Sequence, residues 1–252
     1  MSDDLAFALH LADVADAISL EHFRGDPHSR TKADGTIVTE ADEAVERAMR
    51  DEIAATFPDD GVLGEEEGDA SAGAERRWIL DPIDGTSNYA RGRPIWASLI
   101  ALEVSGEIVV GVASAPALRE RYEASRGGGA RRNGEPIAVS KTHELADAHI
   151  AYTSYAHFEY LGRREGWTKL VRSVNQARGF GDFWGHMLVA AGHMDLMAEP
   201  IVNPWDVAPV LVIVEEAGGR FTDLDGNRTI GGGSSLSSNG VLHDAALACF
   251  SN

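Results

Sequence analysis

Short apolar runs alternate with helical patterns along the second half of the sequence. The expected strands lie near residues 149–153, 176–180, 194–198 and 219–222. The segments between them have helical periodicity over 157–173, 182–192 and 205–217. Helices interleaved with short strands are typical of layered α/β folds, in which helices cover the faces of a sheet. The alternation therefore predicts an α/β fold.

The first half of the sequence predicts two helices followed by adjacent strands. Apolar side chains recur on a near-helical period over 3–24, and 40–57 forms a second helical pattern behind Thr39, a residue suited to capping. The dipeptides Ser105-Gly106 and Asn133-Gly134 predict tight hairpin turns, the second of type I′. The expected strands cover 62–63, 78–80, 95–104, 107–115 and 119–125.

The chain has 252 residues, enough for one large domain or two small ones. It contains neither an internal repeat nor a long linker. We therefore expect a single domain with two lobes that share a core, an N-terminal α+β lobe over about 1–145 and a C-terminal α/β lobe over about 146–252.

Charge and composition exclude several classes of protein. Acidic residues outnumber basic ones 40 to 22, giving a formal charge of −18, which disfavours binding to nucleic acid or to an anionic membrane. No apolar run approaches the roughly 20 residues needed to span a bilayer, and the acidic N-terminal segment lacks a basic leader. The single cysteine, Cys249, excludes an internal disulfide framework. We expect a cytoplasmic protein.

The segment ILDPIDGTSNY places two acids, Asp81 and Asp84, where an apolar run meets a turn. Burying both carboxylates costs on the order of several kcal/mol unless a cation compensates them. Mg²⁺ takes such oxygen ligands, and the carbonyl of Ile83 offers a third. Gly85 lets the backbone approach a ligand, and a helix that starts there would direct N–H groups at a phosphate. The alternative is an ordinary surface turn with an aspartate cap.

Three further acids lie where they can join this pair. Glu65 follows a short expected strand, Asp206 lies in the first turn of a largely apolar helix, and Asp42 lies one turn into the helix behind Thr39. Each has a simpler explanation: a solvated acidic loop for Glu65, a helix cap for Asp206, and an interaction with the helix dipole for Asp42.

In combination these segments are specific. GEE, DPIDGTSNY and WDVAPVLVIVEEAGG occur in this order, with VTEAD before them and GGGARRNGEPIAVS between. This arrangement resembles the inositol monophosphatase family of metal-dependent phosphatases over roughly residues 32–222. The resemblance implies an alternating αβαβα sandwich, usually assembled as a homodimer, that acts on a small phosphate monoester.

The resemblance also implies roles for individual residues. Asp42 pairs with Thr86 to orient the attacking water, and Gly85, Thr86 and Ser87 cradle the phosphate. Lys32 falls near a basic position of a metal-binding loop. Water would attack the phosphorus in line without a covalent enzyme intermediate. The residues implied to hold two or three Mg²⁺ ions, Glu65 being also part of the catalytic set, are Glu65, Asp81, the Ile83 carbonyl, Asp84 and Asp206.

Two other acids bear on the choice of substrate. Asp182 and Glu199 line the organic end of the substrate by family position, and the run RGFGDF around Asp182 is similar to histidinol-phosphate phosphatases. Histidinol phosphate carries an ammonium and an imidazole that two carboxylates would attract. The alternatives are an inositol or sugar-phosphate monophosphatase, in which Asp182 merely caps a helix, and a catalytically silent binding protein. The spacing of His157, His186 and His193 is unlike a zinc site, so we expect structural histidines with satisfied hydrogen bonds.

Overall fold

The computed structural model describes residues 3–23, 29–31, 37–70 and 73–251, and Lys32 lies outside these ranges. The helices are α1 (Asp3–Phe23), α2 (Glu40–Thr56), α3 (Thr86–Tyr89), α4 (Tyr155–Tyr160), α5 (Arg164–Ser173), α6 (Asp182–Ala190), α7 (Pro204–Glu216) and α8 (His243–Leu247), with a 3₁₀ turn at Leu145–Asp147. The strands are β1 (Ser29–Thr31), β2 (Ile37–Thr39), β3 (Gly61–Gly64), β4 (Gly68–Asp69), β5 (Arg76–Asp84), β6 (Ala97–Val104), β7 (Glu107–Ala115), β8 (Glu120–Ser125), β9 (Ala130–Arg132), β10 (Glu135–Pro136), β11 (His149–Tyr152), β12 (Gln176–Arg178), β13 (Leu196–Glu199), β14 (Arg220–Thr222) and β15 (Ser235–Ser238).

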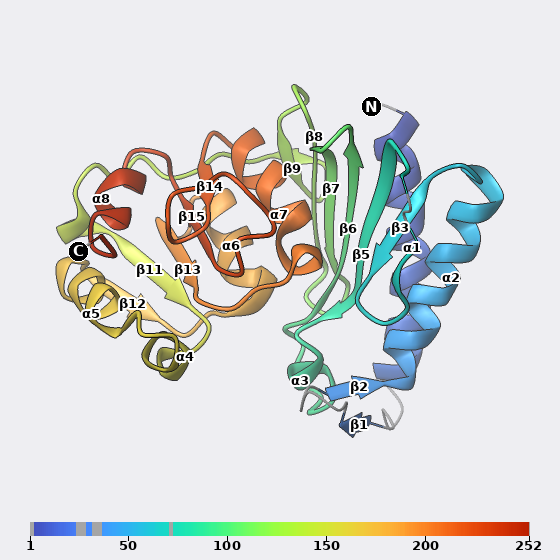
Figure 1. Cartoon of the computed structure of the whole chain (residues 1–252), viewed down its shortest axis with the longest axis horizontal. Coiled ribbons are helices and arrows are strands. Elements are labelled where there is room, and N and C mark those ends of the chain that lie inside the picture. The colour runs from blue at the N-terminus through green and yellow to red at the C-terminus, as the bar shows by residue number, and fades with distance from the viewer. Residues whose placement is uncertain (1–2, 24–28, 32–36, 71–72, 252) are drawn as a thin grey trace.

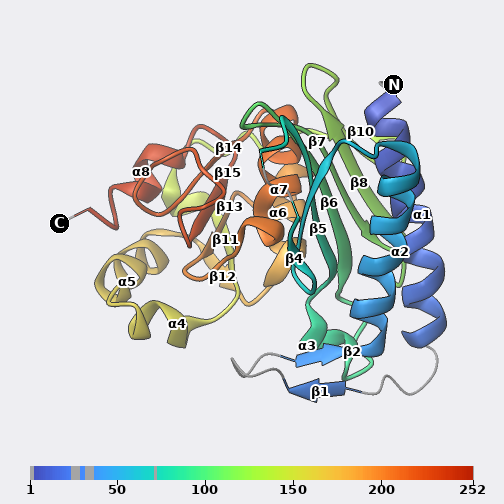
Figure 2. The same ribbon diagram turned by 45° about the vertical axis from the view of Figure 1, so that its right-hand side comes forward.

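The first sheet separates two layers of helices. Within the described residues its strand order is β10-β9-β8-β7-β6-β5-β3-β4. Alternate side chains of a strand point to opposite faces, so Trp78 and Leu80 pack with α1 and α2 while Ile79 packs with α6 and α7. α1 and α2 lie together along the outer face in both ribbon views (Figures 1 and 2).

The second sheet completes the layers. Its order is β12-β11-β13-β15-β14, with β11 parallel to both β12 and β13. α6 and α7 lie between the two sheets, and α4, α5 and α8 cover the far side, where Phe158 stacks on Trp167 with ring centroids 4.2 Å apart (Figure 1). The succession of helices, sheet, helices, sheet and helices confirms the predicted αβαβα sandwich. None of the helices in the described ranges is both long and apolar enough to cross a membrane.

The predicted hairpin turns form for the expected reason. Ser105 and Gly106 have φ values of 51° and 83°, and Asn133 and Gly134 have φ values of 52° and 82°. Positive φ at both central residues is the geometry of a type I′ turn, whose twist matches the flanking strands. These turns connect β6 to β7 and β9 to β10.

Three details of the secondary structure differ from the sequence-based expectation. The helix expected over 157–173 is two helices, α4 and α5, because the chain passes through the left-handed region at Gly162, where φ is 70°. The strand expected at 78–80 continues through Asp84. The sequence pattern also missed β1, β2, β4, β15 and α8, which are five residues long or shorter.

A buried histidine of α8 predicts acid-dependent stability. Burial, with the positive charge of Arg220, lowers the pKa of His243 to about 4. The folded protein favours the neutral ring of His243. The contribution of His243 to the free energy of unfolding is therefore complete above the pKa of the unfolded state, about 6.5, and is lost as the pH falls through 4. We expect wild type to lose up to about 3 kcal/mol more than His243→Gln between pH 7 and pH 4 in urea unfolding. Parallel losses in the two proteins would contradict this account.

Candidate active site

Neighbouring strands bring the acids to one edge of the first sheet. β3 and β5 run parallel with Gly64 opposite Leu80, and the Glu65 N–H donates to the Leu80 carbonyl at 3.2 Å, which places Glu65 beside Asp81. The register of β5 against β6 shifts between Asp81 and Asp84. Such an irregularity redirects side chains and is frequent beside active sites.

Three carboxylates from β5 and α7 converge at this edge. Asp81, Asp84 and Asp206 each offer an oxygen within 4.8 Å of the others. Asp81 is 1% exposed, and its Oδ1 accepts no hydrogen bond from any residue that the structure describes. An unpaired buried acceptor costs on the order of 1–3 kcal/mol, and more when charged. The donor set, all oxygen and all acidic, fits a hard divalent cation.

The acids raise one another's pKa values. Burial raises the pKa of Asp81, with the charge of Glu65 adding to it, and burial followed by the charge of Asp182 raises that of Asp84. Burial also raises the pKa of Asp206 to about 7, although its Oδ2 accepts from the Asn203 N–H at 2.7 Å. Asp206 therefore belongs to the capping box at the start of α7, where Asn203 is the cap residue, and it also belongs to the cluster. Without a cation, the cluster resists full ionisation near neutral pH.

Most of the predicted site residues share one cavity of about 620 Å³. A second cavity of about 130 Å³ adjoins it, with Asp84, Asp182 and Asp206 lining both. Glu199 lines the smaller cavity only. The predicted residues around the larger cavity are Glu65, Asp81, Ile83, Asp84, Gly85, Thr86, Ser87, Asp182 and Asp206.

The turn after β5 requires glycine. Gly85 has φ 81°, and a Cβ there would lie 3.0 Å from the Ile95 carbonyl oxygen. α3 begins immediately afterwards, and the Thr86 hydroxyl donates to the Ile83 carbonyl at 2.9 Å. The sharp turn thus places Gly85, Thr86 and Ser87 at the wall of the acidic cavity.

Asp42 lies behind this turn and does not line the cavity. Its Oδ2 accepts from the Thr39 N–H at 2.8 Å and from the Thr39 hydroxyl at 2.6 Å, while its Oδ1 is 3.3 Å from the Thr86 hydroxyl. Burial raises the pKa of Asp42 to about 6. The structure therefore brings Asp42 and Thr86 together, and Asp42 reaches the cavity only through Thr86.

Asp182 is not a helix cap. Gly181 precedes α6 at the cap position, and the Asp182 Oδ2 accepts from the Asn88 amide at 3.2 Å. Asp182 also has φ 57°, a left-handed conformation that is strained for a residue with a side chain. The Phe183 N–H that follows donates to Asp84 Oδ2 at 2.7 Å. The capping alternative is therefore wrong, and Asn88 joins the site without having been predicted.

The histidines have different environments. His186 is buried and bonded at both nitrogens, to Ser237 Oγ at 2.7 Å and to Glu199 at 2.8 Å, as expected of a satisfied histidine. The side chains of His157 and His193 are exposed and have no hydrogen-bond partner among the described residues. The expectation of structural histidines with satisfied hydrogen bonds is therefore wrong for these two. His157 lines both cavities from α4. Sequence spacing could not show this, because α4 and the acids lie far apart in the chain.

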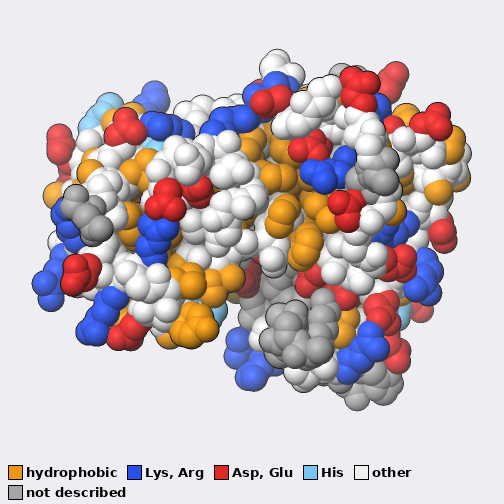
Figure 3. Space-filling view, viewed as in Figure 1, with side chains coloured by type: hydrophobic (Ala, Val, Ile, Leu, Met, Phe, Trp, Pro, Cys, Tyr) orange, Lys and Arg blue, Asp and Glu red, His pale blue; other side chains and the backbone are white. Residues whose placement is uncertain are grey.

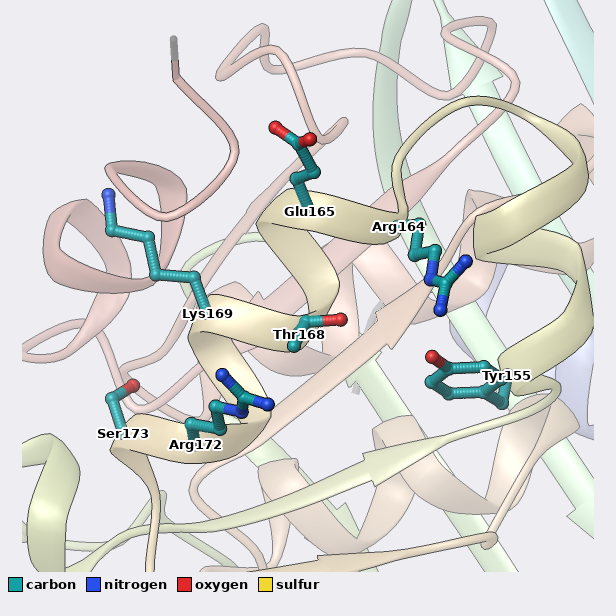
Figure 4. A pocket seen from close by; sticks show the side chains of 7 residues that line it. All are labelled: Tyr155, Arg164, Glu165, Thr168, Lys169, Arg172 and Ser173. Carbon is teal, nitrogen blue, oxygen red and sulfur yellow. The ribbon is translucent and has the colours of Figure 1, made fainter.

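α4 also carries exposed aromatic rings beside the site. Tyr155 is 46% and Tyr160 is 85% exposed, and hydrophobic side chains gather over α4 in the space-filling view (Figure 3). A separate cavity of about 760 Å³ lies along α5, with Arg164, Thr168 and Arg172 among its lining side chains (Figure 4). This cavity is open and basic, so it is not where acidic ligands converge.

Comparisons with known proteins agree with this geometry. The model of the inositol monophosphatase family matches residues 1–251. The chain is 46% identical to a histidinol-phosphatase of Streptomyces coelicolor over 97% of its length and 96% of the relative's. It is 45% identical to a histidinol-phosphatase of Mycobacterium tuberculosis, with the same coverage of both chains.

The fold has a solved counterpart of similar size. The crystal structure of the extragenic suppressor protein suhB from Bartonella henselae superposes with a TM-score of 0.91 at 28% identity, covering 100% of this chain and 99% of that one. With the family match over nearly the whole sequence, these likenesses identify the protein as a member of the inositol monophosphatase family.

Proposed function

We propose that this protein is a Mg²⁺-dependent phosphoric monoester hydrolase that converts L-histidinol phosphate to L-histidinol and phosphate. The choice of substrate rests on the small cavity beside the acidic cluster, which Asp182 and Glu199 both line. The relatives named histidinol-phosphatase support the same choice.

The acidic cluster would hold two or three Mg²⁺ ions through Glu65, Asp81, Asp84, Asp206 and the Ile83 carbonyl. When bound, the ions lower the pKa of water, neutralise phosphoryl oxygens and stabilise the leaving alkoxide. The protein's own contribution is to position the groups. The turn at Gly85, Thr86 and Ser87 holds the phosphate in line with the attacking water.

Thr86 and Asp42 handle the proton of that water. The Thr86 hydroxyl has two acceptors, the Ile83 carbonyl at 2.9 Å and Asp42 Oδ1 at 3.3 Å. As water forms its bond to phosphorus and the ester P–O bond breaks, Thr86 Oγ1 accepts the water proton and passes its own to Asp42. The leaving alkoxide takes a proton from solvent to become the alcohol, and Asp42 returns its proton to solvent. With a pKa near 6, Asp42 is ionised at pH 7.5 and close enough to neutrality to act as a base.

The small cavity that would receive the organic end of the substrate is lined by acidic side chains. Burial, with the charge of Glu199, raises the pKa of Asp182 to about 6, so the two carboxylates repel each other until a cation arrives. The ammonium or the imidazolium of histidinol phosphate relieves that repulsion, and the hydroxyls of inositol do not.

A panel of phosphate esters tests the substrate, with released phosphate measured with and without Mg²⁺. We expect kcat/KM for histidinol phosphate to exceed that for inositol-1-phosphate by at least about tenfold, since a hydrogen bond to a charged group is worth about 1.5–3 kcal/mol. Equal or better turnover of inositol phosphate would reject histidinol phosphate as the substrate. Release from none of the esters would favour a silent binding protein.

Removing the charge of Asp182 tests the pocket directly. Asp182→Asn retains the shape and loses the charge, so we expect KM for histidinol phosphate to rise about tenfold or more while the KM for inositol phosphate changes less than about twofold. The exposed Asp244→Asn on α8, which lines neither cavity of the site, is the control. A parallel rise for both substrates would show that Asp182 does not select the leaving group.

The homodimer, the cytoplasmic location and the role in histidine biosynthesis stay predictions. So does the division into two lobes at about residue 145. Sedimentation of the purified protein tests the first of them.

A further inference from the structure

Two residues form hydrogen bonds with the Glu199 carboxylate. His186 on α6 brings Nε2 to 2.8 Å from Glu199 Oε2, and the Thr153 hydroxyl donates to Glu199 Oε1. His186 is 1% and Glu199 is 6% exposed. Thr153 and Glu199 line the small cavity, and His186 is absent from the linings of both cavities of the site.

The two hydrogen bonds of His186 fit one tautomer of its ring. We assign the proton to Nε2, so that His186 donates to Glu199 Oε2. Nδ1 in turn faces Ser237 Oγ at 2.7 Å, on β15. The ring is therefore fixed at both ends, between the second sheet and the carboxylate.

Glu199 needs such support because its neighbours are acids. Its charge contributes to the raised pKa values of Asp182 and Asp206. A carboxylate that repels its neighbours turns away from them unless hydrogen-bond donors hold it in place. The two donors, one on each oxygen, keep Glu199 beside the cavity.

We propose, resting on the function proposed above, that His186 is a positioning residue that fixes the Glu199 carboxylate for binding the cationic leaving group. His186 does not touch the substrate. Its loss weakens recognition of the organic end and leaves the cluster of Asp81, Asp84 and Asp206 free to cleave esters that lack a cation.

Two substitutions of His186 form a matched pair. The amide nitrogen of His186→Gln reaches the position of Nε2 and can still donate to Glu199, whereas that of His186→Asn reaches only the position of Nδ1. We expect His186→Asn to raise KM for histidinol phosphate about tenfold or more, with kcat/KM for p-nitrophenyl phosphate within about twofold of wild type. His186→Gln should restore most of the affinity. The exposed His193→Asn is the control.

A structural role would give a different result. If both His186 variants lose activity on both esters in proportion to a lower melting temperature, the positioning role is overturned. Thr153→Val, which removes the other donor from an exposed position, should show the same selective rise in KM even if His186→Asn folds poorly. In a Glu199→Gln background, His186→Asn should add no further rise, because the two residues act as one unit.

The same measurements distinguish a wrong substrate from a wrong role for His186. If wild type prefers inositol phosphate, histidinol phosphate is wrong as the substrate. A selective rise in KM for inositol phosphate in His186→Asn would then show that His186 positions Glu199 for a neutral leaving group, which would overturn the cationic part of the proposal. An unchanged KM would remove the positioning role altogether.

Discussion

Asp84→Asn should abolish phosphate release, with kcat/KM lower by on the order of 10³-fold or more. Asp84 lies in the cluster of three carboxylates, and metal ions held there supply several kcal/mol of stabilisation to the transition state. Asparagine keeps the shape, and its amide oxygen can still accept from the Phe183 N–H. The measurement is released phosphate at saturating Mg²⁺, with the exposed Asp51→Asn on α2 as the control.

The same substitution should stabilise the metal-free protein. The pKa of Asp84 is raised by burial and by Asp182, so its stabilising contribution is present below the unfolded value of about 3.8 and is lost as the pH rises through the folded value. Without metal at pH 8, Asp84→Asn should therefore melt at least about 2 °C above wild type. The difference in melting temperature between Asp84→Asn and wild type should decrease towards pH 5. A variant that is less stable at pH 8 and fully active would contradict both expectations.

Asp42→Asn should lower kcat by about 10²–10⁴-fold without weakening the binding of metal. Proton transfer by a positioned base contributes about this much, and Asp42 is the only described carboxylate within hydrogen-bonding distance of the Thr86 hydroxyl. The amide oxygen of asparagine can still accept from Thr39, so the start of α2 should be retained.

The two variants should differ in their response to Mg²⁺. The rise in melting temperature on adding Mg²⁺ should be retained in Asp42→Asn and reduced in Asp84→Asn, because a ligand that binds the folded state stabilises it in proportion to its affinity. An unchanged kcat in Asp42→Asn would show that Thr86 and Asp42 do not handle the proton of the attacking water.

Local patterns predicted most of the fold. Long helices such as α1 and α2, and strands joined by Ser105-Gly106 or Asn133-Gly134, follow from periodicity and turn chemistry. The break at Gly162 was missed because a single glycine inside a helical pattern is often tolerated. The continuation of β5 through Asp84 was missed because a proline favours the end of a strand, and here it lies at a register shift.

Some residues of the candidate site could be predicted from the local sequence, and others could not. Acids that follow strands or open helices, such as Glu65 and Asp206, can be picked out from their neighbours in sequence. Asn88 and His186 could not, because their importance lies in single hydrogen bonds to Asp182 and Glu199. Asn88 and Asp182 are 94 residues apart, and no periodic pattern reports a contact at that separation.

Anomalous scattering from a crystal soaked in Mn²⁺, a stand-in for Mg²⁺ with the same preference for oxygen ligands, tests the central claim most directly. We predict two or three peaks in the large cavity, ligated by Glu65, Asp81, Asp84 and Asp206. A crystal in which these carboxylates bind no ion at millimolar Mn²⁺ would contradict the account.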